Sequence, residues 1–233
     1  MFQAVTRVEL HHFSDASQEY CYGAVSYLRL VSDDGQVHCA FVMGKSRVKP
    51  LGSTMTVPKQ ETAATLLTQM NSMIIRELEG RMKINDVTYW TDSTIVLRYI
   101  LNTRRRFVTF VANRVALIHQ SSNPKQWRHV RSEDNPADYA SRGLKPSESD
   151  KLDVWRNGPD FLWKNSKEWP KQPEGILKKL SDEDKGVKKE KNVGLSTASR
   201  DFWEDLFRRY STWTKLVRSV AWLVHGAKRF SAS

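Results

Sequence analysis

The chain has 233 residues, and its 37 Lys and Arg outnumber 26 Asp and Glu to give a formal net charge of +11. No uninterrupted apolar run approaches the roughly 20 residues of a membrane span, and the first residues lack the charged and then apolar pattern of a secretory signal. We therefore expect an intracellular protein that is not secreted and has no membrane partner. The basic excess is consistent with a polyanionic partner, or simply with solubility.

Three strand-like runs open the chain. They cover Val8–Phe13, Tyr22–Val31 and Val37–Val42, and Asp33–Gly35 forms a hairpin turn signal between the second and third. Strands joined by hairpins are antiparallel. Cys21 and Cys39 lie near these runs without metal-type spacing, so we expect reduced packing residues.

Helical and strand patterns alternate in the next part of the chain. Pro58 opens a long helical pattern that ends at Gly80, and proline is favoured in a first turn because its missing N–H costs nothing there. The elements expected after it are a strand over Val87–Trp90, helices over Ser93–Leu101 and Phe107–His119, a strand over Gln126–Val130 and a short helix over Asn135–Ser141.

The resulting element order is βββ-α-β-α-α-β-α. The first three strands are expected to be antiparallel, and the last two follow helical crossovers and are expected to be parallel. This order predicts an α/β fold with a mixed five-stranded sheet flanked by helices.

The remaining sequence divides into segments of different composition. We expect one domain over residues 1–146 and an aromatic, turn-rich extension packed against it over 147–170. Residues 171–196 are predicted to be a charged linker, because 171–192 hold seven Lys and five Asp or Glu with little apolar content. Residues 197–233 carry an apolar stripe at helical spacing and are predicted to form an amphipathic helical connector.

Four carboxylates fall at the ends of these elements. Asp15 ends the first strand, Glu61 lies in the first turn of the long helix, Asp92 ends the fourth strand, and Asp138 lies in the last short helix. Each has an ordinary alternative role: Asp15 and Asp92 as helix or turn caps, Glu61 as a partner of the helix dipole, and Asp138 as a solvated helix residue. Their joint placement favours a common site over four separate roles.

A cluster of acids at one sheet edge indicates a metal site. Uncompensated carboxylates repel one another and raise each other's pKa, and a divalent cation resolves the conflict. Hard oxygen ligands suit Mg²⁺ or Mn²⁺, and two such ions about 3.5–4 Å apart can activate water and stabilise the leaving oxygen of a phosphodiester. The sequence holds neither a phosphate-binding P-loop motif nor the G-x-S-x-G motif of serine hydrolases.

Eight motifs, in matching order over residues 8–163, carry a resemblance to a known family. They read FSDAS, GAVSYLR, GKSRVKPL, VPKQETAA, WTDSTIVL, FVANRV, WRHVRSEDNPADYASRGL and WRNGPDFL. The chain resembles a ribonuclease H type 1 domain, and more closely the ribonuclease H segment of BEL/Pao-type LTR retrotransposon Pol polyproteins. The resemblance implies a ribonuclease H-like fold and a fragment with a C-terminal connector.

The resemblance also implies an activity and its residues. It assigns Asp15, Glu61, Asp92 and Asp138 as catalytic residues and metal ligands for two Mg²⁺ or Mn²⁺ ions, with Asp134 the less favoured neighbour. The implied reaction is hydrolysis of the RNA strand of an RNA–DNA hybrid during reverse transcription. The implied partners are the hybrid and the reverse transcriptase and integrase segments of the parent polyprotein, in a cytoplasmic particle or the nucleus.

Two departures from the family pattern are visible. The usual apolar residue before the helix glutamate is Gln60 here. Many cellular relatives carry a histidine in the loop before the last acid, and residues 131–134 contain none. His129 falls in the predicted strand instead, where a structural or substrate-side role is favoured over a proton shuttle. We therefore expect slower or differently assisted departure of the leaving group.

Several polar and basic side chains are candidates for contact with the hybrid. They are Lys45, Arg47, Lys49, Ser93, Arg104, Arg105, Arg106, Asn113 and Arg114. Such groups bind phosphates and supply affinity without sequence information. The ordinary alternative for the cations is a solvated surface.

Two other functions fit parts of the pattern. One is a catalytically inactive, nucleic-acid-binding remnant of a retroelement, which would bind hybrid without metal and cleave nothing. The other is an integrase- or transposase-like nuclease on the same fold, which usually places its last glutamate on a late helix. The early Glu61 and late Asp138 favour the ribonuclease order.

Overall fold

In the computed structural model, the described residues are 4–17, 21–48, 59–102, 105–145, 147–176, 180, 184, 186–188, 217 and 221. Their strands are β1 (Val5–Ala16), β2 (Cys21–Ser32), β3 (Val37–Val48), β4 (Asp86–Thr91) and β5 (Trp127–His129). Their α-helices are α1 (Lys59–Leu78), α2 (Thr94–Ile100), α3 (Thr109–Ser121), α4 (Ala137–Arg142) and α5 (Ser149–Asn157). Short 3₁₀ turns are η1 (Pro124–Gln126), η2 (Ser132–Asp134), η3 (Asp160–Trp163) and η4 (Ser166–Glu168).

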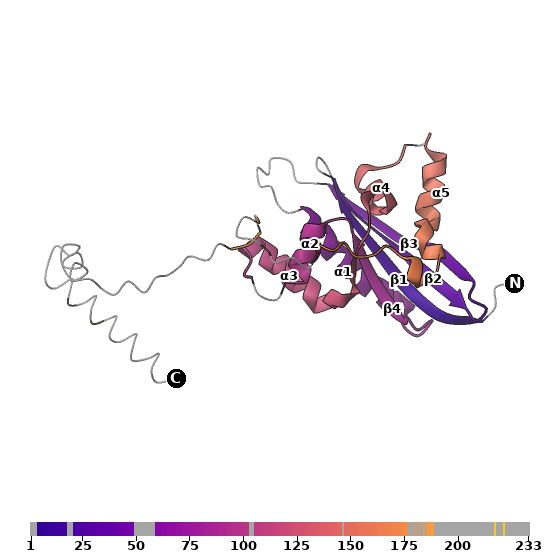
Figure 1. Ribbon diagram of the computed structural model, residues 1–233, viewed down its shortest axis with the longest axis horizontal. Coiled ribbons are helices and arrows are strands. Elements are labelled where there is room, and N and C mark those ends of the chain that lie inside the picture. Colours follow the sequence, from indigo (N-terminus) through magenta and orange to yellow (C-terminus); the bar gives the residue numbers. More distant parts are fainter. Residues whose placement is uncertain are drawn as a thin grey trace. The chain divides into compact units, whose positions relative to one another are not determined.

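The described strands form one five-stranded sheet in the order β3-β2-β1-β4-β5 (Figure 1). β1 pairs antiparallel with β2, and β2 pairs antiparallel with β3. β4 pairs parallel with β1 and with β5. The predicted mixed five-stranded sheet is confirmed, because hairpins join the first three strands and helices precede the last two.

Two strands extend further than their apolar patterns indicated. β1 begins at Val5, three residues before the predicted start at Val8, and β3 continues to Val48 beyond the predicted end at Val42. The extra β3 residues pair in register with β2, from Gly44 opposite Val25 to Val48 opposite Cys21. Residues 45–48 are partly or fully exposed, so backbone pairing rather than apolar burial defines this part of the strand.

Helices α1, α2 and α3 cover one face of the sheet. The buried residues of this layer are Ala24, Leu66, Leu67, Met70, Tyr89, Val96, Leu97, Ile100, Ile118 and Trp127. On α1 the buried positions recur at helical spacing, so its apolar stripe lies on the sheet as predicted.

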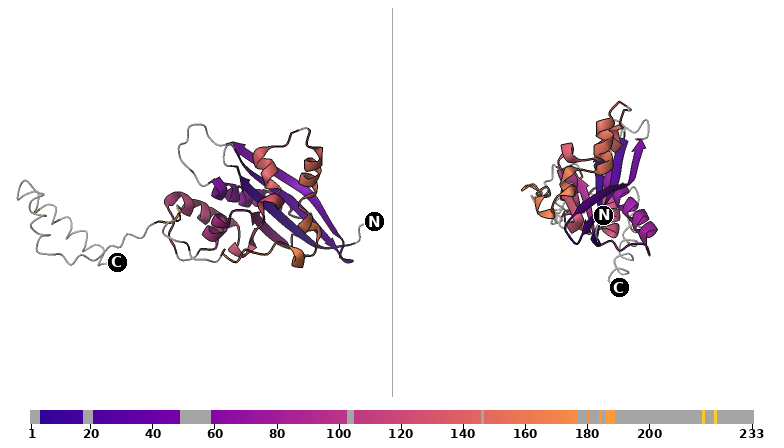
Figure 2. Two further views of the ribbon diagram at one scale, coloured as in Figure 1. Left: turned by 45° about the horizontal axis from the view of Figure 1, so that its top comes forward. Right: turned by 90° about the vertical axis from the view of Figure 1, so that its right-hand side faces the viewer.

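The opposite face is covered by α4 and by residues that follow it. Its buried core contains Phe13, Val25, Tyr27, Trp90, Val130, Ala137, Phe161, Leu162 and Trp169. Figure 2 shows α1 and the orange residues 160–176 on opposite sides of the strands. The aromatic extension therefore supplies core residues to the sheet, with the Trp155 ring 4.5 Å from that of Phe41.

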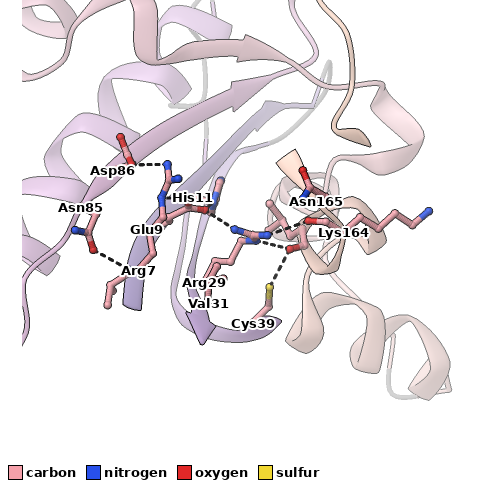
Figure 3. Close-up of polar contacts among 12 residues, drawn as sticks. Arg7, Glu9, His11, Arg29, Val31, Cys39, Asn85, Asp86, Lys164 and Asn165 are labelled. Atoms are coloured by element: carbon pink, nitrogen blue, oxygen red, sulfur yellow. Dashed lines mark hydrogen bonds and ion pairs between the residues drawn. The ribbon is translucent and has the colours of Figure 1, made fainter. Parts of the chain in front are cut away.

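A buried arginine attaches this extension to the strands (Figure 3). Arg29 of β2 donates to the carbonyl oxygens of Leu162 at 2.6 Å and Lys164 at 2.9 Å. Its third partner is Glu9 of β1, at 2.8 Å from Nη1 to Oε2. The Arg29 guanidinium also lies 5.3 Å from the Trp169 ring centroid. One side chain thus connects two strands to both 3₁₀ turns of the extension.

Part of the segment predicted as a charged linker lies in the core. Ile176, Leu180 and Val187 are buried. Val187 forms an antiparallel bridge with Phe107, and the Gly186 N–H donates to the Tyr99 hydroxyl at 3.2 Å. These apolar residues lie between the charged residues of the segment in the sequence and are buried in the domain. The composition of the segment did not indicate this burial.

The chain divides into two compact units, residues 1–189 and residues 190–233. The predicted connector over 197–233 lies outside the described residues, except for Val217 and Ala221, which are helical. Within the described part of the chain, we find no helix with the length and apolar character needed to cross a membrane.

Candidate active site

Asp15 and Asp92 lie at the same edge of the sheet, on neighbouring strands. The parallel register of β1 and β4 pairs Phe13 with Trp90 and Ser14 with Thr91, so Asp15 and Asp92 occupy the next position on each strand path. Asp15 is only 9% exposed, and Asp92 is half-buried directly after β4. This arrangement is the one expected at the carboxyl ends of parallel strands.

Helix α4 brings Asp138 to the same place. The Asn135 side-chain amide donates to the Ser14 carbonyl oxygen at 3.0 Å, and the Asp138 N–H donates to the Asn135 carbonyl oxygen at 3.1 Å. These bonds connect the start of α4 to the residue before Asp15. The short helix is therefore fixed to the edge of the sheet that carries the strand-end acids.

Gly23 allows α4 to lie directly on β2. A Cβ atom at Gly23 would be 2.7 Å from the Ala140 carbonyl carbon and 2.7 Å from the Ser141 nitrogen, which is too close for any side chain. Gly23 is the register partner of Asp15. The close approach thus sets the distance between Asp15 and the helix that carries Asp138.

Each of these three acids forms a hydrogen bond or an ion pair with a nearby side chain. The Ser141 hydroxyl donates to Asp15 Oδ2. The Ser132 hydroxyl donates to Asp92 Oδ2 at 2.8 Å. Arg142 Nε lies 2.7 Å from Asp138 Oδ1, one helical turn away. All three partners come from the single segment that connects β5 to the end of α4.

The charge of Asp15 acts on both of the other acids. Burial raises the pKa of Asp92, and the charge of Asp15 adds to that rise against the hydrogen bond from Ser132. Burial also raises the pKa of Asp138, again assisted by the charge of Asp15 and opposed by Arg142. Asp15 is therefore the common neighbour of the other two acids, as mutual repulsion of clustered carboxylates predicts.

The fourth predicted acid, Glu61, is the third residue of α1. Its backbone is helical as expected, and its side chain lies outside the described part of the structure. Within that described part, no cluster of three or more His, Cys, Asp and Glu side chains is arranged to hold a metal ion. The donor set still suits a hard divalent cation, because its atoms are carboxylate oxygens whose charges oppose one another.

Two neighbours of Asp92 have structural roles. Ser93 is the N-cap of α2 and its Oγ accepts from the Val96 N–H at 3.3 Å. It is 6% exposed, and contact with nucleic acid stays a prediction. His129 Nε2 lies 3.2 Å from the main-chain oxygen of Asp92, so this nitrogen must carry the proton and donate. His129 therefore orients the backbone at Asp92.

The β3 cations lie at the edge that carries the acids. Arg47 pairs in register with Tyr22, which in turn pairs with Ala16 directly after Asp15. Arg47 is exposed, while Lys45 is half-buried with its Nζ 3.4 Å from the Met73 sulfur. The next predicted cation in this group, Lys49, lies outside the described residues.

The second predicted basic group lies around the start of α3. Arg106 is exposed, and its carbonyl oxygen accepts from the Lys188 N–H at 2.8 Å. Asn113 is exposed on α3, and the Arg114 guanidinium lies 3.4 Å from the Phe110 ring centroid. Arg105 is half-buried with its backbone bonded to Asn102, and Arg104 lies outside the described residues.

Three polar residues of the site were not singled out from the sequence. They are Ser132, Asn135 and Ser141. Helical spacing could have indicated Ser141, because Ala137 and Ser141 are one helical turn apart on α4 and both are buried. A buried serine on the same short helix as a candidate ligand is a position where a supporting hydrogen bond can be sought.

Comparison with known families adds a sequence match to this geometry. Residues 1–93 match the family model described as the Pao retrotransposon-like RNaseH-like domain. Over these residues the chain is similar to that family. The match contains Asp15, Glu61 and Asp92 and ends before Asp138, and it confirms the predicted resemblance over its length. Comparison with curated proteins found no match.

Several solved ribonuclease H structures are similar to this chain at low sequence identity. RNase H1 from Halobacterium salinarum NRC-1 is 16% identical, over 63% of this chain and 98% of its own, with a TM-score of 0.35. The N-terminal RNase H domain of rv2228c from Mycobacterium tuberculosis is 10% identical over 65% and 96%, with a TM-score of 0.38. LC11-RNase H1, solved with an RNA/DNA hybrid, is 13% identical over 57% and 93%, with a TM-score of 0.37.

Proposed function

We propose that this domain is a metal-dependent endonuclease that hydrolyses the RNA strand of RNA–DNA hybrids during reverse transcription of a retrotransposon. One observation carries the proposal: Asp15, Asp92 and Asp138 lie at one edge of the sheet, where burial, assisted by the charge of Asp15, raises the pKa of Asp92 and of Asp138. Acids held in mutual repulsion at a partly buried edge are arranged to bind a cation rather than to stabilise the fold.

The residues that would hold the metal are Asp15, Asp92, Asp138 and Glu61. Bound Mg²⁺ or Mn²⁺, with two ions expected, would supply an activated water and stabilise the leaving oxygen of the phosphodiester. The carboxylates themselves provide hard oxygen donors and the negative charge that the cations require. Arg142 must exchange its contact with Asp138 for solvent or phosphate if Asp138 is to serve as a ligand.

Recognition of the hybrid would come from cations on either side of the acids. Arg47 and Arg106 are exposed, and they can reach phosphates from β3 and from the residues before α3. Phosphate contacts position the duplex without reading sequence. Choice of the RNA strand would rest on 2′-hydroxyl contacts and on the A-like shape of the groove.

The loop before the last acid carries Ser132 and no histidine. In this structure the Ser132 hydroxyl is bonded to Asp92, so it supports the carboxylate. We expect the leaving 3′ oxygen to take its proton from solvent. This makes turnover depend on the metal site more than on a side-chain acid.

The same proposal places the domain in a larger assembly. A retrotransposon ribonuclease H domain works beside a reverse transcriptase, and its polyprotein also carries an integrase. We therefore propose these two segments as its partners, in a cytoplasmic particle or in the nucleus.

The test is cleavage of a defined hybrid. Purified chain is incubated with 5′-labelled RNA annealed to DNA, in Mg²⁺, Mn²⁺ or EDTA. Asp15→Asn and Asp92→Asn remove one carboxylate charge each, and Asp153→Asn on the exposed side of α5 is the matched control. We expect metal-dependent cleavage of RNA that both site variants lose by at least 100-fold and the control keeps. Equal cleavage by all four proteins would indicate a contaminating nuclease and overturn the proposal.

A nucleic-acid-binding domain without catalysis is the second candidate. One observation favours it: in the described part of the chain, Asp138 is paired with Arg142 and no three-residue metal cluster is arranged. This candidate predicts hybrid affinity that is the same in Mg²⁺ and in EDTA, with no cleavage by a folded protein. Fluorescence anisotropy of a labelled hybrid measures that affinity in the same samples.

A further inference from the structure

We propose that Ser132 and Ser141 are positioning residues that orient the two strand-end carboxylates for cation binding. This inference rests on the proposed function, because it assigns supports to the same acids. Ser132 bonds to Asp92 and Ser141 bonds to Asp15, in both cases at Oδ2. A hydroxyl that engages one carboxylate oxygen fixes the rotation of the carboxylate plane and so aims the other oxygen.

Ser141 is held rigidly for this task. It is 2% exposed on α4, and its backbone nitrogen lies where the missing side chain of Gly23 leaves room. Its hydroxyl has one hydrogen and two acceptors in reach, Asp15 Oδ2 and the Asp138 carbonyl oxygen at 3.1 Å. An ionised carboxylate is the stronger acceptor, so the hydrogen goes to Asp15.

Ser132 is exposed, yet its position is fixed by the turn that carries it. Arg131 Nε lies 2.8 Å from Asp134 Oδ2, and the Asp134 N–H donates to the Arg131 carbonyl oxygen at 3.0 Å. Just before this turn, His129 bonds the main chain of Asp92. The backbone and the carboxylate of Asp92 are therefore both held from the segment that follows β5.

One continuous segment, from β5 to the end of α4, thus contacts every described acid of the site. It supplies Ser132 to Asp92, Ser141 to Asp15 and Asp138 itself, and Asn135 fastens it to the carbonyl oxygen of Ser14. Packing of the core does not require the hydroxyl of Ser141 to face a carboxylate. A hydrogen bond from the exposed Ser132 to a carboxylate adds little to the stability of the fold. Both hydroxyls point at acids because they order those acids before a cation arrives.

The test measures cation binding directly, without substrate. Mn²⁺ is titrated into metal-free wild type, Ser132→Ala, Ser141→Ala and Ser132→Thr, and bound ion is read by electron paramagnetic resonance. Loss of an outer hydrogen bond to a metal ligand weakens binding by about 10- to 100-fold. We expect that loss in both alanine variants and recovery in Ser132→Thr, which keeps the hydroxyl. Ser72→Ala on α1 is the control, because that hydroxyl bonds the Thr68 carbonyl oxygen of its own helix, at 3.1 Å.

Cleavage of the hybrid separates positioning from catalysis. If Ser132 orients Asp92, then Ser132→Ala regains the wild-type maximal rate at high Mn²⁺ and differs only in the ion concentration that it needs. Thermal unfolding of Ser141→Ala checks that this buried substitution leaves a folded protein. If Ser141→Ala does not fold, the exposed substitution Ser132→Ala still tests the positioning role.

The outcomes distinguish this inference from the proposed function. If wild type binds Mn²⁺, Asp92→Asn weakens the binding and Ser132→Ala leaves it unchanged, the positioning role is overturned while the metal site stands. If wild type binds no Mn²⁺ and cleaves no hybrid, the proposed function fails and the positioning role fails with it. A rate deficit in Ser132→Ala that high Mn²⁺ does not recover would also contradict positioning.

Discussion

Arg29 of β2 and Glu9 of β1 form a buried ion pair, with 2.8 Å between Nη1 and Oε2 and about 5% of either side chain exposed. Arg7 joins from the outer side, with Nε 2.7 Å from Glu9 Oε1 and Nη2 2.7 Å from Asp86 Oδ2 (Figure 3). The ion pair therefore connects β2, β1 and the start of β4. Since Arg29 also binds two carbonyl oxygens of the extension, it links the sheet to the layer above it.

The ring of His11 completes this network in its neutral form. The Trp90 indole N–H, which can only donate, lies 3.2 Å from His11 Nδ1, so His11 accepts there and carries its proton on Nε2. That proton points to Glu9 Oε2 at 3.3 Å. Burial lowers the pKa of His11 and outweighs the opposing contact with Glu9. The positive charges that compensate Glu9 are therefore those of the two arginines.

Removing Arg29 should destabilise the domain strongly. Arg29→Ala leaves the charge of buried Glu9 beside the exposed Arg7 and the neutral His11. It also removes the donor to the carbonyl oxygens of Leu162 and Lys164. Breaking a buried pair in this way costs about 3–5 kcal/mol. Urea denaturation followed by tryptophan fluorescence measures the loss, with exposed Arg156→Ala on α5 as the matched control. A loss below about 1 kcal/mol would show that the pair is not an essential link.

Truncation tests whether the extension belongs to the folded domain. A chain ending at residue 146 lacks the buried side chains of Phe161, Leu162 and Trp169 and exposes the Trp90 face of the sheet. We expect residues 1–189 to unfold cooperatively and residues 1–146 to aggregate or lack a cooperative transition. Circular dichroism during heating distinguishes the two. Equal melting temperatures of the two proteins would mean that the folded domain ends at the predicted boundary, residue 146.

Acidification should destabilise the protein in two steps. Burial lowers the pKa of His12 from 6.5 to about 3, although its Nε2 bonds Asn71 Oδ1 at 3.0 Å. Burial opposes the ionisation of Glu9, but the hydrogen bonds from His11 and Arg29, together with the charge of Arg29, lower its pKa from 4.5 to about 2. In both windows the unfolded chain binds more protons than the folded one, so stability falls as pH falls.

The upper window belongs to His12 and His11, whose pKa values burial lowers in both cases, and the part of His12 can be isolated by substitution. The free energy of unfolding should fall from about pH 6.5 downward, and the loss from Glu9 should begin near pH 4.5. His12→Gln keeps a polar side chain without a titrating ring and should reduce the slope between pH 6.5 and 4.5, leaving the part that comes from His11. Urea denaturation at half-unit steps of pH gives that slope. An unchanged slope would mean that another group titrates there.

Much of the fold followed from local patterns in the sequence. The turn at Asp33–Gly35 and the helical spacing after Pro58 depend on neighbouring residues, and so the element order and sheet type were predictable. The end of β3 was not, because Lys45, Ser46 and Arg47 are polar, and this part of the strand is defined by backbone pairing with β2. Burial of Val187 likewise depends on its bridge to Phe107, some eighty residues earlier.

The candidate site divides in the same way. Asp15 and Asp92 were predictable because each ends a strand and the two strands are parallel neighbours. The supports at Ser132 and Ser141 were not, because the Ser141 bond requires α4 to lie on the bare backbone of Gly23 and the Ser132 bond joins residues 40 positions apart. Glu9 and Arg29 alternate with apolar residues in their strands, a pattern that reads as a solvent-facing edge. The distant carbonyl oxygens of Leu162 and Lys164, together with Glu9, make the interior position of Arg29 favourable.

Gly23→Ala should impair the site more than the fold. Its Cβ would lie 2.7 Å from backbone atoms of α4, which cannot move aside as a side chain can, so α4 must shift and carry Asp138 and Ser141 with it. Gly44→Ala is the matched control, since the three atoms nearest its Cβ would be side-chain atoms of Trp155 and Phe41, the closest at 3.0 Å. We expect hybrid cleavage to fall at least 10-fold in Gly23→Ala, with weaker Mn²⁺ binding, and to change less than threefold in Gly44→Ala. If the two variants cleave equally well while Gly23→Ala stays folded, the spacing between β2 and α4 does not set the geometry of the acids.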